Sequence, residues 1–531
     1  MFSRNAAIVA SCVMIAIAGT AGAQDGKVGL TVSKETTYVT SPLSPNGTID
    51  YVEAYNELRG KGVSPEDNAA RDLAMAIGPR LFPKETARQI RHVLGLPENF
   101  EERKGFVPID EFADSPASAT RMLLRATSIP WSPRMMPELA KWINANDALL
   151  DAVAKAVEKD RYFMPMVPHD RYSTIEDALG PDMEVYRRVA QALACRGTMR
   201  AASRDVDGGW ADIMAASRLG RLVASEATME SCIVGVHMDT DAANAVRGLL
   251  IRNTVPADKA GAFLSAIDAL PAPCDLPKAV DVGARMHQLS LAMVLANAGP
   301  EKADELVLKA KGPGEGAPTS DEEWRWVRAM INWDTVTRSL NARCDALRDL
   351  ARVGEIGKRG QALKSMWAEY NDLCSITTSR AVSISAALAA QKRMFQAVTL
   401  ALLQDPSNDM TALSSRITSD VTNLMLCAYI PPVLSAMAPR DGLRASWTVN
   451  KVALALEAYK SAKGSYPDKL SSLKVVDEDL DIEDPCADDT PLHYWRDDDG
   501  YMLYSIGPNR KDDGGSSDER KSHDDIAVKR R

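Results

Sequence analysis

The sequence predicts a mainly α-helical protein that ends in a small α+β module. Aromatic residues make up only 6% of the chain while alanine and leucine are abundant, and this composition favours helix over sheet. Apolar residues recur at helical spacing up to about residue 445, whereas alternating aromatic residues, typical of strands, gather near the C-terminus. We therefore expect an irregular multi-helix domain over residues 24–445, with a break into two subdomains near 312–320. A module with a helix and an antiparallel sheet should follow over residues 446–531.

The size and charge of the chain narrow the class of protein. At 531 residues the chain is too long for one compact core, and this length suggests about two to four domains. The net charge of −9 and the isoelectric point near 5.4 argue against nucleic acid as a main partner, because phosphate binding requires clustered lysine and arginine. We expect a folded protein that does not bind nucleic acid.

Residues 1–23 have the layout of a secretory signal peptide. Arg4 is followed by an apolar run over Ala6–Ala18 and by Ala21-Gly22-Ala23, after which cleavage is expected. The run is shorter than the roughly 20 residues that a membrane-spanning helix needs. Lipidation at Cys12 is the alternative, but only a short apolar run precedes it. We expect an extracytoplasmic protein (periplasmic, cell-surface or secreted) with no integral membrane segment in the mature chain.

The cysteines fit an exported protein. Disulfides persist outside the reducing cytoplasm, and an odd number of cysteines remains after the signal peptide, so at least one should be unpaired. No CxxC or cysteine–histidine spacing indicates zinc, and most of these cysteines should be small buried hydrophobes. Their pairing stays open. They are Cys195, Cys232, Cys274, Cys344, Cys374, Cys427 and Cys486.

Short local signals predict the elements of the helical part. Residues 28–32 alternate and should be extended, Pro45-Asn46-Gly47 marks a turn, and Ser64–Asp67 is typical of a helix start. An antiparallel helical hairpin is expected over residues 183–238, with its turn at Asp207-Gly208-Gly209. Further long helices are expected over residues 137–159, 323–353 and 362–404.

The C-terminal region predicts a helix and a hairpin. The helix should stop at Gly464, because glycine permits the left-handed cap and Pro467 blocks continuation. Residues 492–496 and 501–506 alternate and are joined by an Asp-rich turn that ends in glycine, which is a hairpin signature. Ile526 should return the chain to the sheet after an acidic loop.

Several motifs occur in a fixed order within residues 446–531. The helix end "ALEAYKSAKGSYPDKLSSL" is followed by "DP", by "PLHYWRDDDGYMLYSIGPN" and by "DDI". In this order they resemble the globular part of the major pseudopilins of type II secretion systems. The chain lacks the glycine-cleaved leader and the apolar first helix of that family, so we do not expect it to polymerise into a pseudopilus.

The resemblance implies a calcium site in the last loop. Its implied ligands are the carbonyl of Ile506, the side chain of Asn509, where the family usually has aspartate, and the carboxylates of Asp524 and Asp525. The loop chemistry agrees, because calcium takes roughly six to eight oxygen ligands and this loop is rich in carboxylates. Its glycines, Gly507, Gly514 and Gly515, permit tight turns. The alternative is a solvated, disordered acidic tail.

The remainder of the chain is similar to large, exported, mostly helical bacterial proteins of uncharacterised function. The stretches that carry this similarity are "ETTYVTSPLSPNGTIDYVEAYNE", "GVSPEDNAA" and "GGWADIMAASRLGRLVASEATMES". It implies an architecture and a compartment but no reaction.

No standard catalytic motif is present, and the chain has only 6 histidines. The most suggestive set is Glu226, Glu230, His237 and Asp241, which on one continuous helix would fall within about 60° of arc. We expect a half-buried polar seam there, and His287 at the edge of a core.

We therefore expect an exported, non-catalytic scaffold or binding protein with a calcium-stabilised C-terminal module and an unidentified protein partner. The alternative is an exported hydrolase or metal-dependent enzyme whose site is built between helices, for instance around Glu226, Glu230 and His237.

Overall fold

The computed structural model describes most of the chain. The predicted signal peptide, the break expected near 312–320 and most of the helix expected over 362–404 lie outside the described residues. The described residues are 29–168, 173–175, 178, 180–297, 328–354, 359–369, 371, 410–488, 490–497, 500–517 and 524–530.

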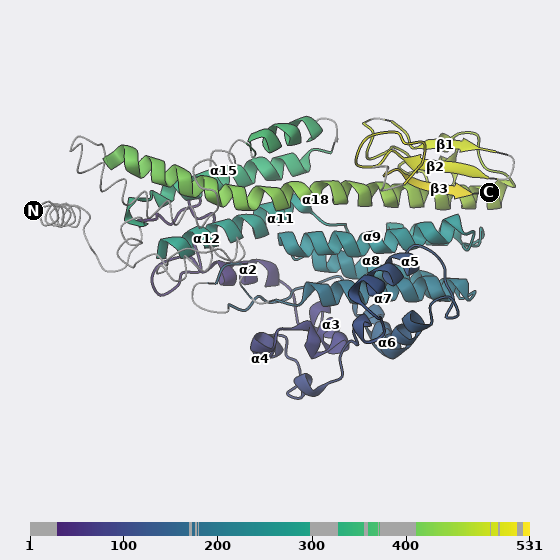
Figure 1. The fold of residues 1–531 in the computed structure, drawn as a ribbon, viewed down its shortest axis with the longest axis horizontal. Helices are drawn as coiled ribbons and strands as arrows, with labels where there is room; N and C mark the ends of the chain where they lie inside the picture. The colour runs from purple at the N-terminus through teal and green to yellow at the C-terminus, as the bar shows by residue number, and fades with distance from the viewer. Residues whose placement is uncertain are drawn as a thin grey trace, which may run out of the picture.

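The protein is mainly α-helical and carries one small antiparallel sheet near its C-terminus, as the sequence predicts (Figure 1). Within the described ranges, no helix is both long enough and apolar enough to cross a membrane. The helices are α2 (Tyr51–Gly60), α3 (Ala69–Ile77), α4 (Lys84–Val93), α5 (Pro116–Ala126), α6 (Pro137–Ala156), α7 (Met183–Ala202), α8 (Val206–Ala224), α9 (Met229–Ile251), α10 (Ala260–Asp268), α11 (Leu276–Ala279), α12 (Arg285–Asn297), α15 (Trp333–Arg352) and α18 (Met410–Lys463). The strands are β1 (His493–Arg496), β2 (Tyr501–Ser505) and β3 (Ile526–Arg530).

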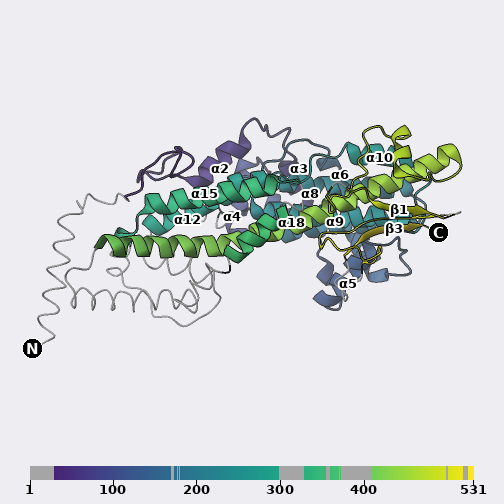
Figure 2. The same cartoon turned by 90° about the horizontal axis from the view of Figure 1, so that it is seen from above.

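The helix α18 runs along the length of the molecule (Figures 1 and 2). Its 54 residues correspond to about 80 Å of α-helix. Its first half, up to Met437, packs into a hydrophobic core with α2, α11, α12 and α15. Its second half, from Leu443, packs into another core with α3 to α10 and the sheet. The boundary expected at 445/446 lies inside this helix, so one rigid element crosses from the helical part into the C-terminal module.

The helices α7, α8 and α9 lie close together because glycines face each other between them. A Cβ added to Gly209 would lie 2.5 Å from the carbonyl oxygen of Gly197, and one added to Gly235 would lie 2.4 Å from that of Gly220. Only glycine lets the backbones approach this closely, so these positions fix the spacing of the bundle.

The C-terminal sheet has the order β1-β2-β3 and is antiparallel throughout. Its hairpin and the return of the chain at Ile526 are confirmed. The hairpin turn is closed by the Gly500 amide, which donates to the Asp497 carboxylate at 2.7 Å. Tyr501, Leu503 and Val528 are buried and belong to the same core as the second half of α18.

The disulfide between Cys232 and Cys274 joins the first turns of α9 to the segment before α11. Cys195, Cys344 and Cys486 are free and buried, in line with the small hydrophobes expected.

Two local predictions are wrong by a few residues, and one stretch expected to be extended forms no strand. The helix α3 begins at Ala69 with Asn68 as its N-cap, not at Ser64–Asp67, because the Asn68 side chain accepts from Ala70 N and also binds Phe163 across the chain. The α7–α8 turn lies at 203–205, before the expected glycines, where Arg204 takes φ 71° and Asp205 caps α8. Residues 29–42 contain no strand, and Leu43 forms only an isolated bridge with Ile49.

The glycine contact between α8 and α9 leads to a stability prediction. Gly235→Ala should destabilise the protein by about 1–3 kcal/mol, because its Cβ overlaps the Gly220 carbonyl and the backbone must move. Gly261→Ala is the matched control: Gly261 lies in α10 with nothing within 4 Å of its added Cβ, so this change should be neutral or mildly stabilising. Urea unfolding checks both, and equal midpoints for the two variants would contradict the close-approach argument.

Candidate functional site

The acidic loop connects β2 to β3 and turns at its glycines. Gly507, Gly514 and Gly515 all have positive φ, as predicted. A Cβ on Gly507 would lie 2.4 Å from the carbonyl oxygen of Asp524, so glycine there lets the two ends of the loop meet. The described residues 506–517 and 524–525 are therefore folded back on themselves.

Three carboxylates converge in this loop. One oxygen from each of Asp513, Asp524 and Asp525 lies within 4.8 Å of the others. Asp525 Oδ2 accepts hydrogen bonds from the amides of Asp513 at 3.0 Å and Gly515 at 2.7 Å, and Asp524 Oδ2 accepts from the Asn509 amide at 3.0 Å. The Oδ1 atoms of Asp524 and Asp525 are buried without a hydrogen-bond partner among the described residues.

The electrostatics of this triad favour a cation. Burial raises the pKa of Asp525, which is 1% exposed, and the charge of Asp513 raises it further, although the Gly515 and Asp513 amides act in the opposite direction. The pKa of Asp524 is also raised, first by burial, and the charge of Asp513 adds to this effect. The carboxylates thus repel one another at neutral pH, and a bound cation would remove this repulsion.

The structure brings together three of the four predicted ligand residues, because Asp524 and Asp525 belong to the triad and Asn509 lies beside it. The Asn509 side chain donates from Nδ2 to Asp513 Oδ2 at 3.4 Å, and its oxygen accepts from the Lys511 amide at 2.6 Å. The Ile506 amide donates to Asp484 Oδ2 at 2.9 Å. Asp513 is the residue that the predicted set missed. It is one of several acidic residues in the loop, and only the fold singles it out.

Asp484 of the "DP" motif anchors the strand end from which the loop departs. It is 3% exposed, and its Oδ1 accepts from the Ser505 hydroxyl at 2.6 Å and from the Cys486 amide at 2.9 Å. Cys486 and Ala445 of α18 form a small apolar cluster against which Ile506 packs. The start of the loop is therefore fixed to the long helix.

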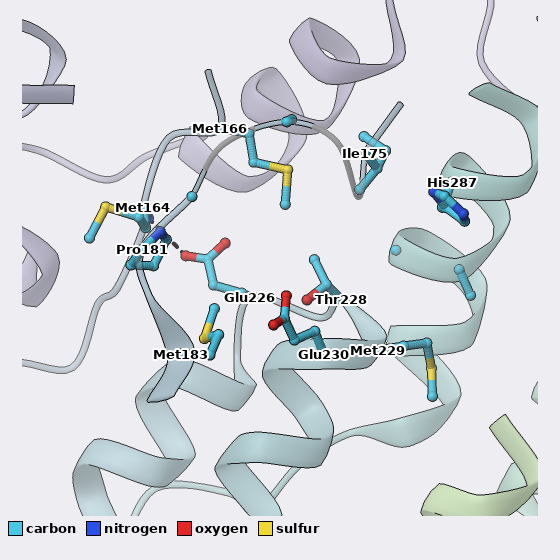
Figure 3. A pocket seen from close by; sticks show the side chains of 14 residues that line it. Met164, Met166, Ile175, Pro181, Met183, Glu226, Thr228, Met229, Glu230 and His287 are labelled. Carbon is cyan, nitrogen blue, oxygen red and sulfur yellow. Dashed lines mark hydrogen bonds between the residues drawn. The ribbon is translucent and has the colours of Figure 1, made fainter. Parts of the chain in front are cut away.

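A second candidate lies between the helices, around Glu226. The expected stripe of Glu226, Glu230, His237 and Asp241 on one helix is wrong: α8 ends at Ala224, and Thr228 caps a new helix, α9. A cavity of about 80 Å³ is lined by Glu226, Glu230 and His287, together with several methionines (Figure 3). Asp241 instead accepts from Gln191 of α7 at 3.1 Å.

Glu226 is held by neutral donors. The Met164 amide donates to Oε1 at 2.8 Å, and the Tyr55 hydroxyl donates to Oε2 at 3.0 Å (Figure 3 draws the first bond). The Tyr55 hydroxyl also contacts the Glu226 carbonyl oxygen. The side chain is 4% exposed, and burial raises its pKa to about 7. Glu226 therefore changes charge near neutral pH.

Comparison of the chain with known protein families, with curated proteins and with solved structures found no match.

The raised pKa of Glu226 predicts a pH-dependent contribution to stability. Because the folded state binds this proton more tightly than the unfolded state, the contribution is fully present below the ordinary pKa of 4.5 and is lost as pH rises through about 7. Glu226→Gln should therefore reduce the difference in unfolding free energy between about pH 5 and about pH 8 by up to about 3 kcal/mol. Glutamine can keep the bond from Met164 and donate to the Tyr55 oxygen.

Denaturant titrations at several pH values measure this difference. Glu57→Gln is the control, because Glu57 is exposed on α2, and it should retain the wild-type pH dependence. An unchanged pH dependence in Glu226→Gln would refute the assignment.

Proposed function

We propose that this chain is an exported, non-catalytic scaffold or binding protein whose C-terminal module is stabilised by calcium. The observation that carries the calcium proposal is the buried Asp525 Oδ1, which has no hydrogen-bond partner among the described residues, within the triad of Asp513, Asp524 and Asp525. A buried carboxylate oxygen without a partner is costly, and a cation supplies the missing contact.

The donor set favours calcium over other metals. The triad offers only oxygen atoms, and hard cations such as calcium prefer carboxylate and carbonyl oxygens, whereas zinc and copper prefer nitrogen and sulfur. A loop that also supplies backbone carbonyls suits the six to eight ligands that calcium takes better than the strict octahedron of magnesium. The resemblance to pseudopilins adds the Ile506 carbonyl and the Asn509 side chain as further ligands.

The role proposed for the ion is structural. The loop closes β2 onto β3, and its first residues pack on α18 through Ile506. An ion there would hold the last strand in the sheet and keep the module attached to the long helix. The proposal includes a protein partner, which a scaffold requires.

The disulfide between Cys232 and Cys274 supports the export part of the proposal. Disulfides persist in oxidising compartments and are rare in the cytoplasm, so this bond fits a chain that carries the signal-peptide pattern at its start.

Calcium should protect the C-terminal module in the full-length protein. Millimolar calcium is expected to slow amide hydrogen exchange in residues 500–530 and to raise the unfolding temperature, and a chelator should reverse both effects. Free calcium at 100 times its dissociation constant corresponds to about 2.7 kcal/mol of stabilisation. Magnesium at the same concentration should have a smaller effect.

Asp525→Asn gives the sharper test. It should abolish the calcium effect, yet in chelator the variant should be at least as stable as the wild type, because it removes a buried, repelled charge. Asp479→Asn, an exposed position of the same module outside the loop, is the control and should keep the full calcium response. If exchange in residues 500–530 is the same with calcium and with chelator, the proposal fails.

A further inference from the structure

The cavity beside Glu226 has walls that come from distant parts of the sequence. They are the segment before α7, the α8–α9 turn and the start of α12. A π-helical turn, Val280–Ala284, leads into α12, and a Cβ on its Gly283 would lie 2.3 Å from the Ala227 carbonyl oxygen. Such turns occur frequently at functional sites.

The Cys232–Cys274 disulfide ties α9 to the segment before α11 close to this cavity. The close backbone contact at Gly283 and this covalent link hold the α8–α9 turn and α9 against the segment that leads into α12. This part of the cavity wall is thus preformed, which lowers the cost of binding a small ligand.

The lining is mainly acidic and apolar, and Thr228 and His287 are its other polar side chains. The side chains of Glu226 and Glu230 carry the carboxylates, and no lysine or arginine is among the lining residues that the structure describes. Most of the remaining wall is formed by methionine, alanine, isoleucine and proline. An anion would be repelled there, whereas a small cation with an apolar body is complementary in charge and polarity.

Glu226 has no ion-pair partner in the described part of the chain. Its two hydrogen bonds come from the Tyr55 hydroxyl and the Met164 amide, which are neutral. Arg59 of α2 and Lys278 of α11 act on it only through space, and Arg59 donates instead to the Ser225 carbonyl. A carboxylate oxygen accepts more than one hydrogen bond, so Glu226 retains acceptor capacity for a ligand.

The methionines do not form a metal site. In Figure 3 the thioethers of Met164 and Met229 point away from the cavity, so the sulfur atoms do not converge as copper(I) would require. The acidic loop is the one place in the described ranges where three or more histidine, cysteine or carboxylate ligand atoms lie within 4.8 Å of one another.

We propose that this cavity binds the ammonium group of a small aliphatic amine, with Glu226 as its counter-ion and with Met166 and Met183 against its alkyl part. An engineered cavity of about 150 Å³ takes up benzene, so this smaller cavity suits a short alkyl chain. Protonation of Glu226 removes the counter-ion, and the affinity for the amine therefore falls as pH is lowered through about 7. The other ionisable groups around Glu226 are Tyr55, Tyr162, Tyr186, Arg59 and Lys278, and Glu230 and His287 line the same cavity.

Titration calorimetry of the full-length protein with n-propylamine tests this proposal, with propan-1-ol as the neutral analogue of the same size. The amine should bind at least about tenfold more tightly than the alcohol near pH 8, and Glu226→Gln should reduce this preference about tenfold or more. Glu57→Gln should bind like the wild type. Binding should be unchanged by a calcium chelator, because the acidic loop packs on the cluster of Ala445 and Cys486, which does not line the cavity.

Each contrary result would overturn the proposal. The first is equal affinity for the amine and the alcohol. The second is wild-type affinity for the amine in a folded Glu226→Gln variant, and the third is no amine binding at millimolar concentration. The pH series on the unmodified protein does not depend on any variant, and an amine affinity that rises as pH is lowered would likewise overturn it. Stoichiometric copper(I) binding that Met166→Leu abolishes would assign the cavity to a soft metal instead.

Discussion

The structure depends on the packing of both halves of α18 into two separate hydrophobic cores. The helix contains Pro431, Pro432 and Pro439, each of which removes a backbone hydrogen bond and disfavours helix by about 3 kcal/mol. It continues because the residues around these prolines, such as Val433 and Met437, are buried against other helices. Tertiary contact therefore outweighs local preference, and the resulting rod aligns the helical part with the C-terminal sheet.

Polar contacts fix the register of α18 in the second core. Asp239 of α9 is 1% exposed and accepts from Arg221 Nε of α8 at 2.8 Å and from the Trp447 indole of α18 at 3.0 Å. Asn450 donates to the Ala243 carbonyl at 2.8 Å. Each of these groups would be left unpaired in the interior if α18 moved along its axis, and an unpaired buried polar group is costly. The same helix then presents Ala445 to the start of the acidic loop, so the register also positions the proposed calcium site.

The C-terminal module was predictable because its signals are local. Gly464 ends the helix with φ 83°, the Asp497–Gly500 turn closes a hairpin, and the loop glycines take positive φ. The ligand set was only partly predictable. The choice of Asp513 among neighbouring acidic residues depends on its amide, which donates to Asp525, and this contact exists only once the loop has folded. The cavity at Glu226 could not be predicted, because Tyr55 and Met164 are far away in sequence.

The sequence by itself determined the mainly helical class, the C-terminal hairpin with its returning strand, and the glycine turns of the acidic loop. These follow from hydrophobic periodicity, aromatic alternation and the conformational freedom of glycine, which act over a few residues. Only the tertiary structure decided where α8 ends and α9 begins, that Cys232 pairs with Cys274, and that Glu226 is buried beside a cavity. These features arise from contacts between segments that lie tens to hundreds of residues apart in the sequence. A local sequence pattern does not specify which of these segments contact each other.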